Sequence, residues 1–296
     1  MVLRLVFFLL MMAAGAAHAN IILLLSDDKP SITGVGQAIQ ASYSGRVDVY
    51  NLAGNRDRNN QVAQSILDSD IQQVIAVGLQ AAQLARNKLS SKQVVFCQVL
   101  NFEEFDLVTP WMKGISALPS LTKQFAAWKQ LDPSLRRIGV ITGRNNKYLT
   151  SEAELAARRN GLELVHVEAA SERAVAFAAQ ELYERKIQGI WLAPDSSILS
   201  QRAVMDLMSF SAKHSLQVLA FSSSLLKEGA LISTAPDFQE IARMAIERLR
   251  KPNEVTGISG DGIVPLSGAK MIISSTAASR FGLDISAKLR GQADVQ

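Results

Sequence analysis

The chain has few of the side chains that metal or thiol chemistry requires. Its 296 residues include one cysteine, Cys97, and three histidines. No intramolecular disulfide can form, so the fold depends on its hydrophobic cores. A catalytic zinc site normally takes three protein ligands. His166 and His214, the two histidines beyond residue 19, are far apart in sequence, and we expect neither a metal nor a cofactor.

Motifs of common enzyme classes are also missing. The chain contains no phosphate-binding loop ending in Gly-Lys-Ser/Thr and no Gly-x-Ser-x-Gly nucleophile motif. Gly34-Val35-Gly36 resembles the start of a dinucleotide-binding loop, but Ile39 stands where the third glycine belongs. Cys97 lies near the end of a predicted strand, and a free cysteine is usually a small buried apolar residue. We therefore expect no catalytic residue and no enzyme activity.

Charge of one sign is not in marked excess. Thirty-one basic residues face 27 acidic ones, which gives a formal net charge of +4. The two signs are interspersed, so there is no electrostatic case for nucleic acid or an acidic membrane as a partner. The composition predicts a globular chain, which we expect to be a monomer.

A long apolar run occurs only at the start of the chain. Residues 1–19 carry one cation, Arg4, then an apolar stretch from Leu5, and end in Ala17-His18-Ala19. This pattern predicts a secretory signal peptide with an Ala-x-Ala cleavage site. No cysteine follows the cleavage site, so lipid attachment is not expected there. The sequence thus predicts an exported, periplasmic protein.

From residue 21 onward, short runs rich in Ile, Val and Leu alternate with stretches of helical period. The predicted strands are 21–25, 46–51, 73–77, 94–98, 137–142, 163–166, 189–193, 217–221 and 230–233. The predicted helices are 34–44, 61–69, 80–89, 121–130, 151–160, 172–186, 200–214 and 237–250, with a last strand and helix at 270–274 and 276–282. Continuously apolar strands between helices are typical of parallel sheets covered on both faces.

The alternation repeats in two halves, about 21–100 and 137–222, and this repeat predicts two lobes. We expect an α/β fold of two doubly wound parallel-sheet, Rossmann-like lobes joined by a hinge. Lobe 1 is predicted to comprise 20–113 plus about 230–257, and lobe 2 to comprise 114–229 plus about 258–296. Residues 101–119 contain Pro110, Gly114 and Pro119 and show neither the helical nor the strand period of apolar residues. They are therefore interpreted as an interdomain crossing.

The loops that follow the strands are rich in small polar residues. In open parallel sheets, ligands bind beyond the carboxyl ends of the strands, where helix N-termini offer free N–H groups. Backbone N–H groups and serines could there hold a carboxylate, while Asp195 or Asp27 receives an ammonium group. The competing interpretation is that these residues only cap helices. For any single loop taken alone, capping is the favoured interpretation. The candidate ligand-binding residues are Ser26, Asp27, Gly78, Leu79, Gln80, Asn101, Ser116, Arg144, Asp195, Phe221, Ser222 and Ser223.

Several short motifs in order carry a family resemblance. They are Leu131-Asp132-Pro133 with Arg137-Ile138-Gly139-Val140, Trp191-Leu192-Ala193-Pro194-Asp195, Val218 with Phe221-Ser222, Gly229-Ala230-Leu231, Pro236-Asp237-Phe238, and Ala277 to Leu283. In these the sequence resembles the periplasmic substrate-binding proteins of ABC importers, in the TrpX-like branch of aromatic amino-acid binders. The resemblance is good over about 115–285 and looser over 20–114.

This resemblance implies a type I periplasmic binding protein fold that closes on a small, amino-acid-like ligand and hands it to a membrane permease. By position, Gly78 to Ala81 and Ser116 would hold the ligand carboxylate and Asp195 its amino group. Phe221 to Ser223 would form the far wall.

Three turns differ from the family pattern and motivate an alternative. They are Gly78-Leu79, Gln98 to Phe102, and Gly143-Arg144-Asn145. The alternative is an accessory or ligand-sensing partner with the same fold and a degenerate cleft, serving a membrane receptor or signalling system. Neighbouring genes for an ABC permease and ATPase would favour transport.

Overall fold

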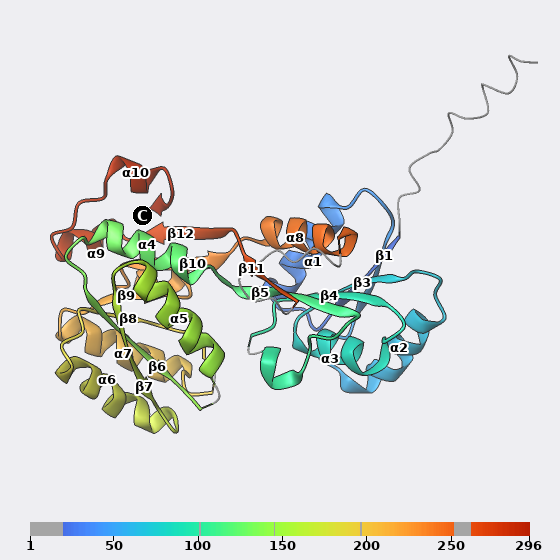
Figure 1. The fold of residues 1–296 in the computed structure, drawn as a ribbon, viewed down its shortest axis with the longest axis horizontal. Coiled ribbons are helices and arrows are strands. Elements are labelled where there is room, and N and C mark those ends of the chain that lie inside the picture. The colour runs from blue at the N-terminus through green and yellow to red at the C-terminus, as the bar shows by residue number, and fades with distance from the viewer. Residues whose placement is uncertain (1–19, 101, 145, 196, 252–261) are drawn as a thin grey trace, which may run out of the picture.

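The computed structural model describes residues 20–296 except 101, 145, 196 and 252–261, and it forms two lobes side by side (Figure 1). Each lobe has a central sheet with helices on both faces, as predicted. Among the described residues, no helix combines the length and apolar character needed to cross a membrane.

Lobe 1 is built on a six-stranded sheet in the order β11-β5-β4-β3-β1-β2, with every neighbouring pair parallel. Its strands are β1 (Ile21–Leu25), β2 (Val47–Asn51), β3 (Gln73–Val77), β4 (Gln93–Cys97), β5 (Met112–Pro119) and β11 (Ile263–Leu266). Its helices are α1 (Pro30–Ser42), α2 (Asn59–Leu67), α3 (Leu79–Lys88) and α8 (Phe238–Arg250), with short 3-10 turns η1 (Arg56–Arg58) and η2 (Phe102–Phe105). Residues of α1 and α8 pack on one face of the sheet, and residues of α2 and α3 on the other.

Lobe 2 is built on a seven-stranded sheet in the order β13-β12-β10-β9-β8-β6-β7. Its strands are β6 (Arg137–Thr142), β7 (Glu163–Glu168), β8 (Gly189–Trp191), β9 (Gln217–Ala220), β10 (Ile232–Pro236), β12 (Ala269–Ile273) and β13 (Asp294–Val295). Its helices are α4 (Leu121–Leu131), α5 (Lys147–Arg159), α6 (Val175–Glu184), α7 (Gln201–Lys213), α9 (Ser275–Arg280) and α10 (Ala287–Arg290), with 3-10 turns η3 (Glu172–Ala174) and η4 (Ser223–Leu226). The one antiparallel pair among the described strands is β10 with β12.

The two lobes repeat one topology. The order 2-1-3-4-5 describes β2-β1-β3-β4-β5 in lobe 1 and β7-β6-β8-β9-β10 in lobe 2. In each lobe the order in which strands are added therefore reverses beside the first strand, at β1/β3 and at β6/β8. Loops beyond the carboxyl ends of these strands form the crevice in which open α/β sheets bind ligands.

The sheets place three segments differently from the sequence prediction. Residues 114–119 belong to β5 in the first sheet, β10 joins the second sheet, and β11 returns to the first. The predicted boundary near residue 257 lies outside the described residues. Each crossing occurs where a strand ends, and Pro119 and Pro236 are the last residues of β5 and β10.

The interpretation of residues 101–119 as a crossing without a strand was wrong. Gly114 was read as a breaker of regular structure, but it lies inside β5 because the neighbouring ring needs the space. A Cβ on Gly114 would lie 2.3 Å from Cζ of Phe96 on β4. The glycine thus marks close packing between two strands.

Candidate functional site

A cleft of about 730 Å³ lies between the lobes and is here called the outer cleft. Lobe 1 contributes the loops after β1, β2, β3 and β4, and lobe 2 contributes the loops after β6 and β8. Seven of the predicted site residues line it: Ser26, Asp27, Gly78, Leu79, Gln80, Arg144 and Asp195. Loops that follow different strands, up to 169 positions apart, therefore meet at one site.

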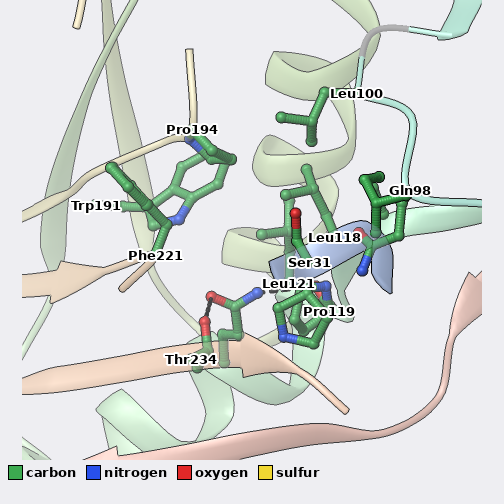
Figure 2. Close-up of a pocket in the computed structure, with 14 residues that line it drawn as sticks. Ser31, Gln98, Leu100, Leu118, Pro119, Leu121, Trp191, Pro194, Phe221 and Thr234 are labelled. Atoms are coloured by element: carbon green, nitrogen blue, oxygen red, sulfur yellow. Dashed lines mark hydrogen bonds between the residues drawn. The ribbon is translucent and has the colours of Figure 1, made fainter. Parts of the chain in front are cut away.

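A smaller cavity of about 240 Å³, the inner pocket, adjoins the outer cleft beside the chain crossings. Ser31, Ile32, Gln98 and Leu100 line both cavities, so the two are continuous. Figure 2 shows Trp191, Pro194 and Phe221 of lobe 2 on one side of the pocket and Gln98 and Leu100 on the other. The site thus has a polar outer part and a largely apolar inner part.

The start of α3 forms one wall of the outer cleft. Gly78, the N-cap of α3, has φ +90° and ψ 169°, a conformation that favours glycine. A Cβ there would lie 2.6 Å from Oγ of Ser26. Ser26 is buried, and its Oγ accepts a hydrogen bond of 2.9 Å from the Ala81 amide. This bond fixes the loop after β3 against the loop after β1.

Asp195 occupies the corresponding position in lobe 2, but its contacts differ from the prediction that it receives a ligand ammonium. The residue is 3% exposed. Its Oδ2 accepts hydrogen bonds from the Gly143 amide at 2.7 Å and from Asn146 Nδ2 at 2.6 Å. Its Oδ1 accepts from the amide and the hydroxyl of Ser197, at 3.0 and 2.6 Å. A carboxylate has about four acceptor sites, so these bonds use them all. The geometry favours a loop-positioning role.

The other predicted residues are distributed as follows. Phe221 lines the inner pocket, and Ser116 lines a side cavity of about 40 Å³ between Leu118, Tyr148 and their neighbours. Ser222 and Ser223 line none of these three cavities, and the Ser222 hydroxyl instead lies 2.9 Å from that of Ser224. Asn101 lies outside the described residues.

Sequence reasoning missed several lining residues. Trp191 is 2% exposed, and its ring meets that of Phe125 edge-on, with centroids 5.7 Å apart. Trp191 is part of a family-like motif, but nothing in that motif indicates that it faces a pocket. Gln98 is part of a turn that differs from the family pattern. Its φ of +57° is unusual for a residue other than glycine, and its buried Nε2 has no acceptor among the described residues.

The lobes touch at one edge of the site through aromatic rings. Phe102, in the loop after β4, meets Tyr148 at the start of α5, with centroids 5.6 Å apart and planes at 71°. Tyr148 and Phe102 both line the side cavity. This contact closes the site on the side of the β4 and β6 loops.

Three crossings connect the lobes behind the site, and hydrogen bonds join them. The third crossing passes through Ser267, whose carbonyl accepts from Lys123 Nζ of α4 at 2.7 Å and whose hydroxyl donates to Glu240 of α8. The Arg243 guanidinium, 2.7 Å from Glu240, lowers the pKa of that carboxyl to about 2. Near the second crossing, Thr234 Oγ1 donates to Gln124 Oε1 at 2.9 Å (Figure 2). These hydrogen bonds tie the crossings that form the hinge region to α4 and α8.

The thiol and the metal-binding side chains of the described residues show no sign of a reactive centre beside the cleft. Cys97 is buried, and burial raises the pKa of its thiol to about 12. A thiol held protonated at neutral pH is a poor nucleophile. No cluster of three metal-binding side chains occurs in the described part of the chain.

Comparisons with known proteins place this architecture. A family model described as ABC transporter substrate binding protein matches residues 28–295. No curated protein matches the chain in sequence. Similar folds occur in an ABC domain from Streptococcus pneumonia in complex with L-Trp, with 18% identity, a TM-score of 0.61 and coverage of 95% of this chain and 100% of that one.

A second similar structure is a ligand-free, open substrate-binding protein with adhesive properties from Clostridium difficile. It is 15% identical, with a TM-score of 0.70 and coverage of 94% and 99%. A third is a conserved domain protein from Vibrio cholerae, 19% identical, with a TM-score of 0.59 and coverage of 94% and 100%. At these identities the structures establish the fold, and it is the fold of type I periplasmic binding proteins.

Proposed function

The chain belongs to the ABC transporter substrate-binding protein family, and we propose that it binds a small molecule between its lobes and delivers it to an ABC permease. The observation that carries this proposal is the continuous site formed by the outer cleft and inner pocket, lined by both lobes. A ligand that contacts both lobes favours the closed arrangement, because only there are all its contacts made.

The cleft chemistry supports a ligand with a polar end and an apolar body. At the start of α3, the amides of Leu79 and Gln80 belong to the first helical turn and lack intrahelical acceptors. Such a terminus favours an anionic group. The inner pocket offers Trp191, Phe221 and Leu118 to an apolar group of modest size. Gly78, Leu79 and Gln80 are the predicted contacts for the polar end, and Phe221 for the apolar body.

The protein reaches its partner in the periplasm under this proposal. Residues 1–19 serve as a cleaved signal peptide without lipid attachment, and the mature chain acts as a monomer. Edman sequencing or intact mass of the protein recovered from the periplasm tests this directly: the proposed mature chain begins at Asn20.

A ligand screen tests the binding function. Thermal melting against amino acids, peptides, sugars, nucleosides and organic acids is expected to reveal ligands that raise Tm with concentration. Isothermal titration then gives the stoichiometry, expected to be one. A complete screen without any ligand would contradict the proposal and favour the accessory-partner alternative, whose fold is the same and whose cleft is degenerate.

A further inference from the structure

The charged groups of the outer cleft are unequally engaged. Three carboxylates line it, those of Asp27, Glu104 and Asp195. Asp195 already accepts four hydrogen bonds. Asp27 accepts from the Lys29 amide at 2.9 Å and lies 3.4 Å from Lys29 Nζ. Glu104 alone among the described lining acids is left without a partner, and it is exposed. Lys29 lines the same cleft, so an ammonium group that paired with Asp27 would meet a cation already present there. The cleft therefore has little capacity to receive an ammonium group.

Donors show the opposite pattern. Arg56 of lobe 1 lines the cleft, and its guanidinium has no partner among the described residues. Arg144 of lobe 2 lines the same cleft, and its Nε lies 3.7 Å from Glu168, with both side chains more than half exposed. An exposed pair of this kind adds little stability and is easily exchanged for another anion. Gln98, at the junction with the inner pocket, has a buried Nε2 without an acceptor among the described residues.

We propose that the ligand is an organic acid: an anionic end without an adjacent ammonium group, carried on an apolar body that enters the inner pocket. Arg56 and Arg144 supply positive charge to the anion from opposite lobes. This inference rests on the proposed binding function and narrows its substrate class. The physical reason is that a buried charge is tolerated only when it is paired, and this site can pair an anion more readily than a cation.

An amino-acid ligand would make a different demand on the same residues. Its ammonium group would need a carboxylate, and Glu104 is the acid that remains for it. Removing the charge of Glu104 would then weaken binding. For an organic acid the same change removes a repulsive charge and strengthens binding.

Matched ligand pairs separate these cases, because each pair differs only in the α-amino group. The pairs are L-phenylalanine with 3-phenylpropionate, L-tryptophan with indole-3-propionate, and L-leucine with 4-methylpentanoate. Titration calorimetry at pH 7.5 and low salt is expected to show the acid binding about tenfold more tightly than its amino acid in at least one pair. Tighter binding of the amino acid in every pair that binds would overturn the inference.

Four variants of the full mature chain complete the test. Arg144→Gln and Arg56→Gln should each weaken the acid about five- to tenfold, and Glu104→Gln should strengthen it about twofold. Arg202→Gln is the matched control, since Arg202 is exposed on α7 and does not line the outer cleft, and it should leave affinity unchanged. Unaltered binding in both cleft arginine variants, or loss of binding in Glu104→Gln, would overturn the inference.

Failure of this inference is distinguishable from failure of the binding function. If none of the six compounds binds, the organic-acid assignment is overturned for bodies of this size. The wider thermal screen decides separately whether the cleft binds any ligand.

Discussion

The two lobes join the same pair of loops in opposite ways. In lobe 1, a side-chain oxygen from the loop after the first strand, Ser26 Oγ, accepts the amide of Ala81 after the third strand. In lobe 2 the direction is reversed: the Gly143 amide, in the loop after the first strand, donates a hydrogen bond to the Asp195 carboxylate after the third strand. Lobe 1 uses one neutral hydrogen bond between the loops, whereas the lobe 2 carboxylate accepts two across the loops and two more from Ser197 in its own loop.

This difference assigns unlike tasks to similar folds. The Ser26 bond leaves the first amides of α3 open to the cleft. The Asp195 bonds instead consume the polar groups of their own loops. Lobe 1 thus presents the first amides of α3, and lobe 2 presents a preorganised wall with Trp191 and Phe221 beside it. Pseudo-symmetry of strand order does not extend to the chemistry of the loops.

The largest expected effect comes from breaking the lobe 2 connection. Asp195→Ala should lower the free energy of unfolding by about 3–4 kcal/mol, because it leaves buried donors without an acceptor. Urea denaturation measures this loss. Asp195→Asn retains one acceptor and should cost less. A loss below about 1 kcal/mol for the alanine variant would show that the four bonds contribute little.

A second change distorts the lobe 1 connection. Gly78→Ala should cost about 2–3 kcal/mol, because the new Cβ meets Ser26 Oγ in a backbone conformation that disfavours side chains. Gly54→Ala is the matched control: its φ is +69°, but no atom lies within 4 Å of the added Cβ. Equal losses in the two variants would mean that backbone conformation alone, and not the contact with Ser26, sets the cost.

Removing the lobe 1 hydrogen bond should cost less than either change. Ser26→Ala deletes the acceptor of the Ala81 amide, and we expect a loss of about 1 kcal/mol, as for other helix-capping hydroxyls. Combined with Gly78→Ala, the loss should be less than additive, since the Oγ that the new Cβ meets is gone. Strict additivity in urea denaturation would contradict the contact geometry.

The smallest effect is a pH dependence confined to lobe 2. His166 Nε2 lies 2.9 Å from Thr142 Oγ1, and burial lowers the pKa of this imidazole, although Glu168 and Glu154 oppose the shift. A lowered folded-state pKa favours the neutral form, so its stabilising contribution is present above about pH 6.5 and declines as the pH falls. Hydrogen exchange at pH 5 and 7.5 should show this loss around β6 and β7, and His166→Asn should abolish it. Equal loss in lobe 1 would contradict the assignment.

Much of the architecture could be predicted from sequence, because buried parallel strands are continuously apolar. Ile21–Leu25 and Gln73–Val77 were predicted with the bounds that the structure shows. β5 was missed because its glycine and prolines resemble loop signals, and β11 because its four residues are too short for a period. Which sheet a strand near the end of the chain joins depends on contacts with residues distant in sequence. The local sequence pattern does not show these contacts.

The site was predictable only as a set of loops. The rule for parallel sheets located the cleft, and seven predicted residues line it. Sequence could not show that the Asp195 carboxylate is saturated, since its partners Gly143 and Asn146 lie about 50 positions away. Nor could it show that Trp191 faces the inner pocket, because the sequence of a buried strand does not indicate which of its side chains borders a cavity.

The return of α8 and β11 to lobe 1 sets an order on folding. Ile241, Ala245, Leu249 and Leu266 complete the same core as Ile21 and Val35. Lobe 1 is the first lobe to be synthesised, but it cannot complete its core until about nine-tenths of the 296 residues have been made. By then the strands of lobe 2 from β6 to β10 are already present. A chain truncated before α8 would leave an apolar face of α1 uncovered. This topology delays completion of lobe 1 until the strands of lobe 2 from β6 to β10 have been synthesised.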